Sequence, residues 1–347
     1  MDIKGLLALA INNGASDLHL SAGLPAMIRI DGDIKPINDR VLNDAMVKTL
    51  IDSVMNNNQL KDYQTLLETD FSFSLPNIGR FRVNVFNQLR GAAATFRMIP
   101  ESIPTLSQLN SPDFFQTLTI KPRGLVLVTG PTGSGKSTTL AALINHINNR
   151  DHAHIITIED PIEFVHSSQK CLINQREVHR DTLGFNEALR SALREDPNVI
   201  MIGEMRDLET IRLALTAAET GHLVFATLHT NSAAKAIDRI IDVFPAGEKD
   251  MIRGMLSESL QAVISQTLLK KIEGGRVAAY EIMVGTAAIR NLIREAKVAQ
   301  MYSAIQTGRK DGMQTLDQSL KELVDKGLIT REEASAKAVN KDIFSVT

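Results

Sequence analysis

GLVLVTGPTGSGKS, residues 124–137, is the most informative segment of the 347-residue sequence. Four apolar residues, 125–128, predict a buried strand, and the glycine-rich turn that follows matches G-x-x-x-x-G-K-[ST] from Gly130 to Ser137. In such a loop the backbone N–H groups surround a phosphate chain, and the N-terminus of the next helix adds positive potential. Apolar residues in 140–147 recur with a helical period, so strand, loop and helix follow in the required order. The segment predicts a P-loop.

The loop also predicts the cofactors. We expect Lys136 to reach the β and γ phosphates and the hydroxyl of Ser137 to bind Mg²⁺. ATP and Mg²⁺ are therefore the expected cofactors. The full set of predicted nucleotide-binding residues is Gly130, Pro131, Thr132, Gly133, Ser134, Gly135, Lys136, Ser137 and Thr138.

Composition narrows the class of protein. The net charge is −2, and Lys and Arg form no long run, so the electrostatic signature of a nucleic-acid binder is missing. A single cysteine, Cys171, excludes an intrachain disulfide and a four-cysteine zinc site. No segment approaches 18 uninterrupted apolar residues, and the apolar stretch at the N-terminus is short, so neither export nor membrane insertion is predicted. We expect a cytoplasmic protein that reaches the membrane through a partner.

Residues 1–110 predict a mixed α/β domain. In residues 79–87, apolar and polar residues alternate, which places Arg82 on the polar face of a half-buried strand. Arg97 occupies a polar position in the strand that follows. A proline-bearing linker over 111–122 then leads to the P-loop strand, and we place the domain boundary there. Helices are expected over residues 3–12 and 43–55, and strands over 16–21, 27–30, 34–37, 79–87 and 92–98.

Residues 123–347 predict a second α/β domain. Strand and helix patterns alternate, which is typical of a doubly wound, mainly parallel sheet. Ligands of such sheets lie beyond the carboxyl ends of the strands. From about residue 246 to 342 we expect mostly helix. The further strands are expected over 154–157, 198–202, 222–227 and 277–284.

Carboxylates follow two of these strands. In most P-loop ATPases an aspartate that supports Mg²⁺ precedes a glutamate that activates water, but Gly203 occupies the aspartate position here. We therefore expect Glu204 to support Mg²⁺ through a water molecule, and another carboxylate to activate the attacking water. The segment TIEDPIEF offers Glu159, Asp160 and Glu163, of which we favour Glu163. For Glu159 and Asp160 a helix cap or an ion pair is an equally good interpretation.

His229 and two arginines are further candidates. His229 follows an apolar strand among hydroxyl residues, where it is placed to sense the γ-phosphate; a buried histidine with satisfied partners is the alternative. Arg82 and Arg97 are candidate arginine fingers, because positive charge assists phosphoryl transfer and the P-loop domain offers mainly Lys136. Their alternative is a solvated strand face. The predicted catalytic residues are thus Glu163, Glu204, Lys136, His229, Arg82 and Arg97.

With these residues identified, the chain resembles the secretion ATPase superfamily, and within it the type IV pilus retraction, or twitching-motility, ATPases (the PilT family). The resemblance extends over nearly the whole chain. SQTLLKK at 265–271 and AIRNLIRE at 288–295 are typical of the retraction branch. The other shared motifs are GASDLHLSAG at 14–23, GRFRVN at 79–84, GPTGSGKST at 130–138, TIEDPIEF at 157–164, IGEMRD at 202–207 and TGHLVFATLHTN at 220–231.

The resemblance implies an ATP-hydrolysing motor that powers pilus retraction. It implies a PAS-like domain over 1–110, a RecA-like ATPase domain over 123–347 with C-terminal helices, and assembly into a homohexamer. The family's arginines at the nucleotide correspond to Arg82 and Arg97. The expected partners are an inner-membrane pilus platform protein and, as a candidate, a paralogous pilus ATPase, with the motor peripherally associated with the inner membrane at the pilus base.

The sequence disfavours three other functions. Pilus assembly and type II secretion ATPases usually add N-terminal domains and a four-cysteine zinc insert, and the sequence has neither. A RecA-like nucleic-acid translocase is disfavoured by the near-neutral charge and by the lack of an aromatic-rich basic groove. A GTPase is disfavoured because the guanine-reading pattern N-K-x-D is absent: Asp342 directly follows Asn340-Lys341.

The motif AIRNLIRE predicts an amphipathic helix. Ile289, Leu292 and Ile293 share its inner face, whereas Arg290 and Arg294 form an i, i+4 stripe that should face outward. By spacing alone this is an ordinary surface helix. The resemblance adds the interpretation that the arginine stripe transmits force toward another domain or the platform protein.

Overall fold

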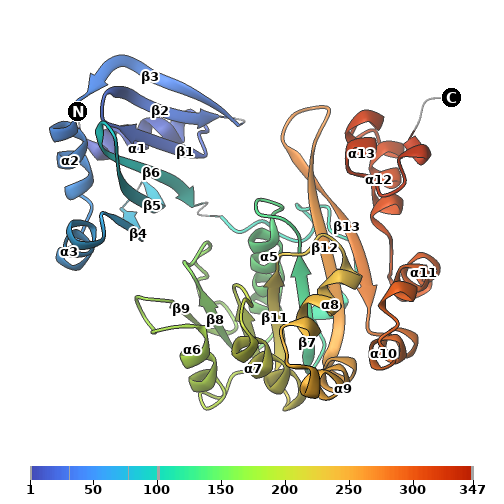
Figure 1. Ribbon diagram of the computed structural model, residues 1–347. Coiled ribbons are helices and arrows are strands. Elements are labelled where there is room, and N and C mark those ends of the chain that lie inside the picture. Colours follow the sequence, from blue (N-terminus) through green and yellow to red (C-terminus); the bar gives the residue numbers. More distant parts are fainter. Residues whose placement is uncertain (1, 31, 77, 100–101, 345–347) are drawn as a thin grey trace. The chain divides into compact units, whose positions relative to one another are not determined.

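The computed structural model describes residues 2–30, 32–76, 78–99 and 102–344. The chain divides into two compact units between Ser102 and Ile103 (Figure 1). Each unit combines helices with one sheet, so the predicted α/β class is confirmed.

The first unit contains a six-stranded antiparallel sheet among its described residues, in the order β3-β2-β1-β6-β5-β4. Its strands are β1 (Asp17–Ser21), β2 (Leu24–Ile30), β3 (Asp33–Leu42), β4 (Glu68–Leu75), β5 (Gly79–Gln88) and β6 (Gly91–Ile99). Its helices are α1 (Ile3–Asn12), α2 (Asp44–Asp52) and α3 (Asn57–Leu66).

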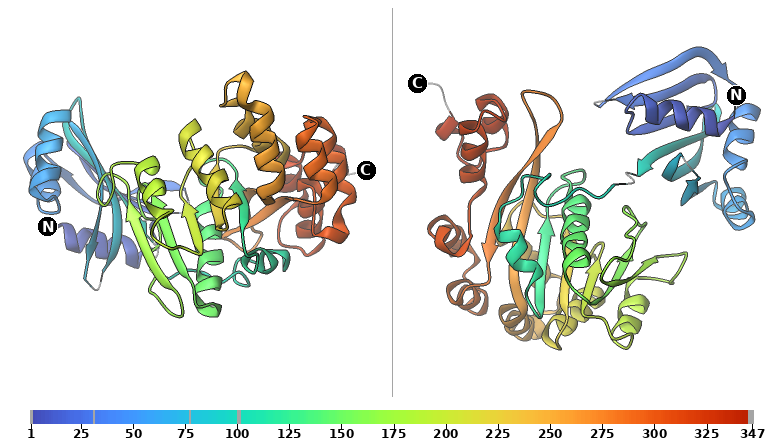
Figure 2. Two further views of the ribbon diagram at one scale, coloured as in Figure 1. Left: turned by 90° about the horizontal axis from the view of Figure 1, so that it is seen from below. Right: turned by 180° about the vertical axis from the view of Figure 1, so that it is seen from behind.

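Alternation along the strands gives this sheet one apolar and one polar face. Phe81, Val83 and Val85 of β5 are fully buried, as their spacing predicted, and they belong to one core with buried residues of α1 and α2. The opposite face of β5 carries Arg82. The two helices cover the apolar face (Figure 2), so the polar residues of β5, β6 and β1 share the other face of the sheet.

The second unit contains a seven-stranded sheet within its described residues, in the order β13-β12-β7-β11-β10-β8-β9. Only the β12–β13 pair is antiparallel, so the predicted mainly parallel sheet is present. The strands are β7 (Gly124–Thr129), β8 (His154–Glu159), β9 (Leu172–Glu177), β10 (Val199–Ile202), β11 (Leu223–Leu228), β12 (Leu260–Lys270) and β13 (Arg276–Val284).

Helices cover both faces of this sheet. The α-helices are α4 (Phe114–Thr119), α5 (Lys136–Arg150), α6 (Phe185–Ala192), α7 (Leu208–Glu219), α8 (Ala233–Asp242), α9 (Lys249–Ser259), α10 (Ala287–Arg294), α11 (Met301–Thr307), α12 (Leu316–Asp325) and α13 (Arg331–Lys337). Short 3₁₀ helices are η1 (Ala246–Glu248), η2 (Val298–Gln300), η3 (Arg309–Asp311) and η4 (Lys341–Phe344).

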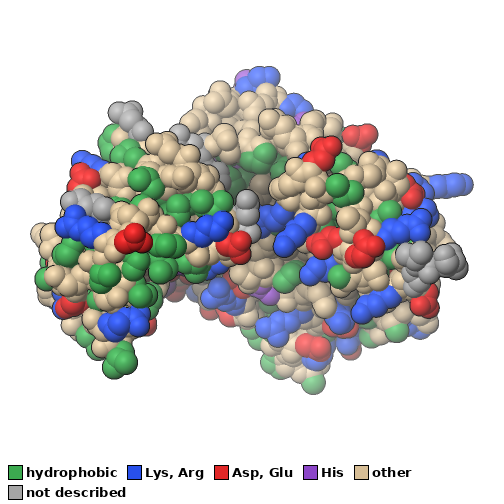
Figure 3. Space-filling model, turned by 90° about the horizontal axis from the view of Figure 1, so that it is seen from above, with side chains coloured by type: hydrophobic (Ala, Val, Ile, Leu, Met, Phe, Trp, Pro, Cys, Tyr) green, Lys and Arg blue, Asp and Glu red, His purple; other side chains and the backbone are tan. Residues whose placement is uncertain are grey.

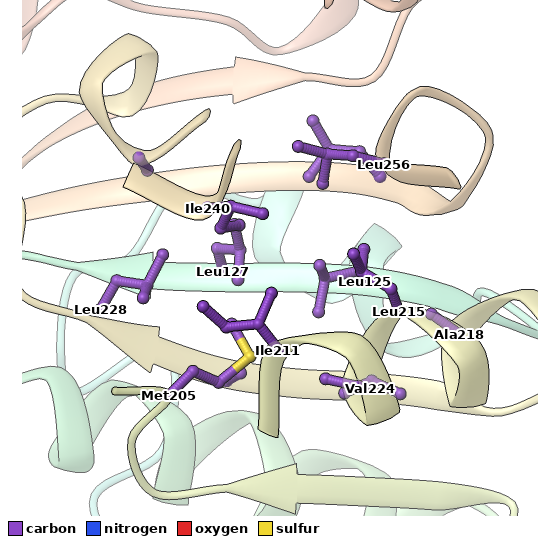
Figure 4. Packing of buried hydrophobic residues seen from close by; sticks show 14 of the residues in the cluster. Leu125, Leu127, Met205, Ile211, Leu215, Ala218, Val224, Leu228, Ile240 and Leu256 are labelled. Carbon is purple, nitrogen blue, oxygen red and sulfur yellow. The ribbon is translucent and has the colours of Figure 1, made fainter. Parts of the chain in front are cut away.

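Side chains that alternate along the central strands enter two different cores. Leu125 and Leu127 of β7 point to the side of α7, α8 and α9, where Ile211, Ile240 and Leu256 pack against them (Figure 4). Val126 and Val128 belong to the core on the side of α4 and α5. Because β7 is buried on both faces, its sequence is a continuous apolar run rather than an alternating one. This rigid central strand positions the P-loop.

The predicted linker over 111–122 requires a correction. The segment contains α4, and its Phe115 and Leu118 are completely buried in the core beside α5. The compact second unit accordingly begins at Ile103. The prolines that suggested a linker flank a short helix, and the apolar residues between them anchor the segment to the core of the second unit.

The expectation of mostly helix after residue 246 was also incomplete. Residues 260–270 form β12, which adds to the sheet beside β7 and begins directly after α9. Its sequence, LQAVISQTLLK, is rich in helix formers and continues the apolar pattern of α9. Only pairing with a neighbouring strand therefore distinguishes this segment from a helix. Three further elements, α3, β4 and β9, were not predicted.

The C-terminal helices α12 and α13 pack on the outer strands of this sheet (Figure 2). Leu269 of β12 and Val277 of β13 share a buried cluster with Leu320 and Ala334 of these helices. None of the helices in the described part of the chain is both long and apolar enough to cross a lipid bilayer. On the face shown in Figure 3, basic and acidic side chains are interspersed.

Candidate active site

The P-loop connects β7 to α5 through a turn that glycine alone adopts readily. Gly130, Gly133 and Gly135 have φ values of +145°, +77° and +88°, in the region where a Cβ is unfavourable. Gly135 immediately precedes α5, and no side chain caps the first N–H groups of that helix. These donors and the helix dipole suit an anion, so the loop fits a phosphate chain.

Lys136 lies over this loop. Its Nζ donates hydrogen bonds to the carbonyl oxygens of Gly130 at 2.9 Å and Pro131 at 3.1 Å, and the side chain is buried. Burial lowers the pKa of Lys136, while the negative charges of Glu204 and Glu163 act in the opposite direction. Two carboxylates from separate segments therefore lie close enough to influence the P-loop ammonium, as the positions of their strands predicted.

Glu204 follows β10, and both of its oxygens face basic groups. Arg206 Nη2 lies 2.7 Å from Oε2, and His229 Nε2 lies 3.1 Å from Oε1. Burial acts to raise the pKa of Glu204, but the hydrogen bonds and charges of Arg206 and His229 outweigh it and lower this pKa. Glu204 is therefore a carboxylate at neutral pH, as support of a cation requires.

The structure explains why glycine occupies position 203. A Cβ there would lie 3.3 Å from both the Cα of Glu159 and the carbonyl oxygen of Ile158, where few real Cβ atoms fit. The carbonyl of Gly203 also accepts a hydrogen bond of 2.5 Å from the hydroxyl of Thr227. Close approach of the β8 backbone thus disfavours a side chain at position 203, and Glu204 is the acid that follows β10.

Glu159 and Glu163 differ sharply in environment. Glu159 is buried at the end of β8, where Oε1 accepts hydrogen bonds from Thr157 at 2.7 Å and Gln175 at 3.2 Å. Burial raises the pKa of Glu159 to about 7, although these hydrogen bonds and one from the Glu163 backbone act against it. Glu163 is exposed. Of these two acids, only Glu163 combines solvent access with an electrostatic effect on Lys136, and Glu159 accepts a hydrogen bond from the backbone N–H of Glu163.

His229 borders a cavity next to the P-loop. The cavity measures about 290 Å³ and is lined by Pro131, His229, Thr230, Asn231 and Lys235. The His229 side chain is 43% exposed, so the alternative of a fully buried histidine does not hold. Hydroxyl, amide and cationic groups line the cavity, so its chemistry suits an anionic ligand.

Arg82 and Arg97 lie opposite each other on neighbouring strands of the first unit. Arg82 forms a two-pronged ion pair with Asp70, with Nη2–Oδ2 at 2.7 Å and Nε–Oδ1 at 3.2 Å. Arg97 binds buried Asp17 through Nε at 2.9 Å, and its side chain is 66% exposed. These carboxylates orient both guanidinium groups on the polar face of the sheet.

The oxygen groups of the second unit fit Mg²⁺. Ser137 contributes a half-buried hydroxyl at the start of α5, and Glu204 contributes an ionised carboxylate. Mg²⁺ at nucleotide sites commonly uses one or two protein oxygens together with phosphate oxygens and water. The described residues contain no cluster of three or more His, Cys, Asp or Glu that would hold a metal alone. The donor set therefore fits a nucleotide-bound cation.

Three residues that contact Glu204 or Glu159 were not identified as functional from the sequence. Arg206 pairs with Glu204, while Thr157 and Gln175 bond to Glu159. Arg206 stands two positions beyond Glu204, and Thr157 two positions before Glu159, so local spacing offered a signal for both. Gln175 offered none, because it belongs to β9, a strand that the pattern did not reveal.

The chain was compared with known proteins. Residues 1–274 match the model of the family described as type II/IV secretion system protein. The type IV pilus retractation ATPase PilT of Pseudomonas aeruginosa is 69% identical over 338 residues, which cover 97% of this chain and 98% of PilT. The twitching motility protein of Neisseria gonorrhoeae is 62% identical over 320 residues, covering 92% of this chain and 86% of that protein.

A solved structure is similarly close. The crystal structure of the pilus retraction motor PilT with bound ADP superimposes with a TM-score of 0.92 at 49% sequence identity. The match covers 99% of this chain and 98% of that one. Both the sequence and the fold therefore match one group of nucleotide-binding motors along nearly their full length.

Proposed function

The chain belongs to the type IV pilus retraction ATPases within the type II/IV secretion system proteins, and from this we propose that it is the motor that powers pilus retraction and twitching motility. It is an ATPase by family. The proposal is supported by near-complete coverage in both directions with a pilus retraction ATPase and by similarity to a twitching motility protein. The alternative function is that of a pilus assembly or type II secretion ATPase of the same superfamily.

One observation carries the enzymatic part of the proposal. Two acidic groups, Glu204 from β10 and Glu163 from the loop after β8, act on the Lys136 ammonium above the P-loop. Phosphoryl transfer to water requires positive charge at the phosphate oxygens, which Lys136 can supply, and a group that positions the attacking water, which a nearby carboxylate can supply. The residues that would bind, orient and deprotonate the reactants therefore converge.

We assign the roles as follows. Lys136 holds the β and γ phosphate oxygens, and its burial strengthens that interaction. Glu163, which is exposed and near Lys136, orients the attacking water and accepts its proton. His229 contacts the γ-phosphate side of the site from the cavity next to Pro131.

Ser137 and Glu204 would hold Mg²⁺, Glu204 through a water molecule. The cation neutralises charge on the phosphate oxygens when it is bound. Arg82 and Arg97 supply further positive charge at the γ-phosphate. This role is supported by the ion pairs that orient the two guanidinium groups: Asp70 binds Arg82, and Asp17 binds Arg97.

The cellular part of the proposal follows from the family. We propose a homohexameric ring at the cytoplasmic side of the inner membrane, at the pilus base, that turns a platform protein and works beside a paralogous pilus ATPase. Neither nucleic-acid binding nor direct membrane insertion is part of the proposal. The near-neutral net charge supports the first of these exclusions.

The test is a gene deletion in the host, scored for surface pili and surface motility. Loss of retraction gives extra pili and no motility, whereas loss of assembly gives no pili. Restoring the wild-type chain should reverse the defect, and restoring Lys136→Ala should not, because the phosphate charge is then unmatched. Absence of pili in the deletion strain would establish the assembly alternative. Stimulation of hydrolysis by single-stranded DNA would instead support a nucleic-acid translocase.

A further inference from the structure

We propose that Gln266, in the segment SQTLLKK, is a positioning residue that fixes the Ser134–Gly135 peptide of the P-loop in the orientation that binds phosphate. Its Nε2 donates a 2.7 Å hydrogen bond to the carbonyl oxygen of Ser134. Its Oε1 accepts a 2.7 Å hydrogen bond from the hydroxyl of Thr139 in α5. The Gln266 side chain is 3% exposed. One buried amide therefore joins the loop to the helix that follows it.

The orientation of the amide is set by its partners. The Ser134 carbonyl can only accept a hydrogen bond, so the NH₂ group must face it, and the amide oxygen then faces the Thr139 hydroxyl. A hydrophobic residue cannot make either bond, and a carboxylate cannot donate to Ser134. The contact pattern thus specifies a neutral side chain with both a donor and an acceptor.

Sheet register brings Gln266 to this place. Ser265 of β12 pairs with Thr129, the last residue of β7, so Gln266 stands beside the point where the chain leaves the sheet to form the loop. A Cβ added at Gly135 would lie only 2.8 Å from Nε2 of Gln266. The glycine therefore makes room for the amide, in addition to providing its φ of +88°.

The consequence for phosphate binding follows from peptide geometry. In a planar trans peptide the C=O and the next N–H point in opposite directions. When Gln266 draws the Ser134 carbonyl toward β12, the N–H of Gly135 points away from β12. Because the freedom of glycine at 135 would permit this peptide to flip, an external hydrogen bond is needed to hold it. A flipped peptide would direct a carbonyl oxygen, not an N–H, toward phosphate.

This role predicts a specific kinetic signature. The Gly135 N–H would contact phosphate in both the ground state and the transition state, so its loss should raise KM for ATP and leave kcat nearly unchanged. Partial unfolding would instead lower kcat through loss of active protein, with KM retained. The effect of Gln266→Leu on KM and on the dissociation constant of ADP should be about tenfold or more, the usual consequence of losing a buried hydrogen bond.

The chain offers a matched control. Gln261 lies on the same strand, and its Nε2 donates a 3.0 Å hydrogen bond to the carbonyl of Arg123 at the opposite end of β7. Gln261→Leu removes the same kind of bond without touching the P-loop. We would measure fluorescent ADP binding and steady-state phosphate release on full-length wild type, Gln266→Leu and Gln261→Leu, with melting curves for each. Weaker binding with raised KM in Gln266→Leu alone is the expected result.

A pH series provides an independent arm. Gln266→Glu places a carboxylate against the Ser134 carbonyl at pH 8, whereas a protonated carboxyl at pH 6 can again donate to it. The ratio of ADP affinities, variant to wild type, should therefore recover as pH falls. Thr139→Val, which keeps the bond from Gln266 to Ser134 but removes the hydroxyl that bonds to Gln266 and Tyr280, should weaken ADP binding less than Gln266→Leu. If Gln266→Leu does not fold, Gln266→Glu and Thr139→Val still test the positioning role of Gln266.

The inference rests on the proposed nucleotide site, and the measurements separate the two. Failure of the wild-type chain to bind ADP would refute the site itself. Normal wild-type binding together with unchanged KM and ADP affinity in Gln266→Leu, or equal losses in Gln261→Leu, would refute the role of Gln266. Unchanged affinity of Gln266→Glu at pH 8 would also refute it.

Discussion

His229 Nε2 lies 3.1 Å from Glu204 Oε1, while Arg206 occupies the other oxygen of the same carboxylate at 2.7 Å. The acid at the end of β10 is therefore connected to the end of β11, the neighbouring parallel strand. This connection would couple the γ-phosphate contact proposed for His229 to the Mg²⁺ support proposed for Glu204. It also predicts that changes at Glu204 and His229 are not additive.

Glu204→Gln should retain nucleotide affinity and lose hydrolysis, by about 100-fold or more in kcat, because a neutral amide can hold water but cannot offset the charge of Mg²⁺. The measurement pairs fluorescent ADP binding with phosphate release. His229→Gln in the same background should add little further loss. Hydrolysis near the wild-type rate in Glu204→Gln would remove this acid from the mechanism.

Glu163→Gln tests the choice of general base. Because Glu163 is exposed and acts on Lys136, its amide variant should bind nucleotide normally and lose kcat by about 100-fold. Glu159→Gln is the matched comparison, and it should retain most activity, since an amide can still accept from Thr157. Normal turnover in Glu163→Gln with inactive Glu159→Gln would reverse the assignment.

Glu159 should also make stability depend on pH. Its pKa in the folded state is raised from 4.5 to about 7 by burial, so between these values the folded chain holds a proton that the unfolded chain has released. The free energy of unfolding therefore falls as pH rises from 4.5 to 7, by about 3 kcal/mol, and levels off above 7. Wild type should lose denaturant resistance between pH 5 and 8 relative to Glu159→Gln. Parallel pH profiles for the two proteins would contradict the shift, and Glu163→Gln should follow wild type.

Arg82→Lys and Arg97→Lys test the arginine fingers. Lysine keeps the charge but loses the planar guanidinium, so each variant should lower kcat by about tenfold or more if the group binds the γ-phosphate. Light scattering must show normal assembly, because loss of assembly would also lower activity. Arg29→Lys, which changes an arginine beside the same Asp17, serves as the control. Full activity in both finger variants would return Arg82 and Arg97 to the role of surface strand residues.

The parts of the fold that the sequence predicted share a strong periodic signal. The strand 79–87 alternated cleanly, and the observed β5 is Gly79–Gln88 with Phe81 and Val83 buried. The P-loop strand and helix were equally clear. By contrast, β12 has no distinctive period: its residues are also good helix formers, and pairing with β7 decides its conformation.

The same limit applies to the site. Position at the end of a parallel strand identified Glu204 and His229, because strand ends converge by topology. Sequence favoured Glu163 over Glu159 but could not show that Glu159 is buried and bonded to Gln175, which lies on a strand 16 residues away. The role of Gln266 could not be predicted from the sequence for the same reason, because its partners, Ser134 and Thr139, lie more than 120 positions earlier in the chain.

The motif AIRNLIRE required the largest correction in side-chain orientation. Arg290 does not face outward in a stripe with Arg294. Its guanidinium donates to the carbonyls of Gly285 at 2.7 Å, Glu258 at 2.5 Å and Leu260 at 2.8 Å, and also to that of Ser257. It thereby joins α10 to the junction of α9 and β12. The helical period placed both arginines on one side of α10, but it could not show that the carbonyls at the end of α9 lie within reach of Arg290.

The two arginines should therefore behave differently. Arg290→Ala leaves several carbonyls without a charged donor and should lower the free energy of unfolding by about 1–3 kcal/mol. Arg294 is 45% exposed and pairs with exposed Glu258, so Arg294→Ala should change stability by less than about 0.5 kcal/mol. Since only the Arg294 guanidinium remains accessible to a partner, we expect Arg294→Ala to hydrolyse ATP at nearly the wild-type rate yet leave cells hyperpiliated and non-motile. Denaturant melts, ATPase rates and motility on the two single variants make the comparison. Intact motility in Arg294→Ala would exclude force transmission through this side chain, and joint loss of hydrolysis and motility would make its role structural.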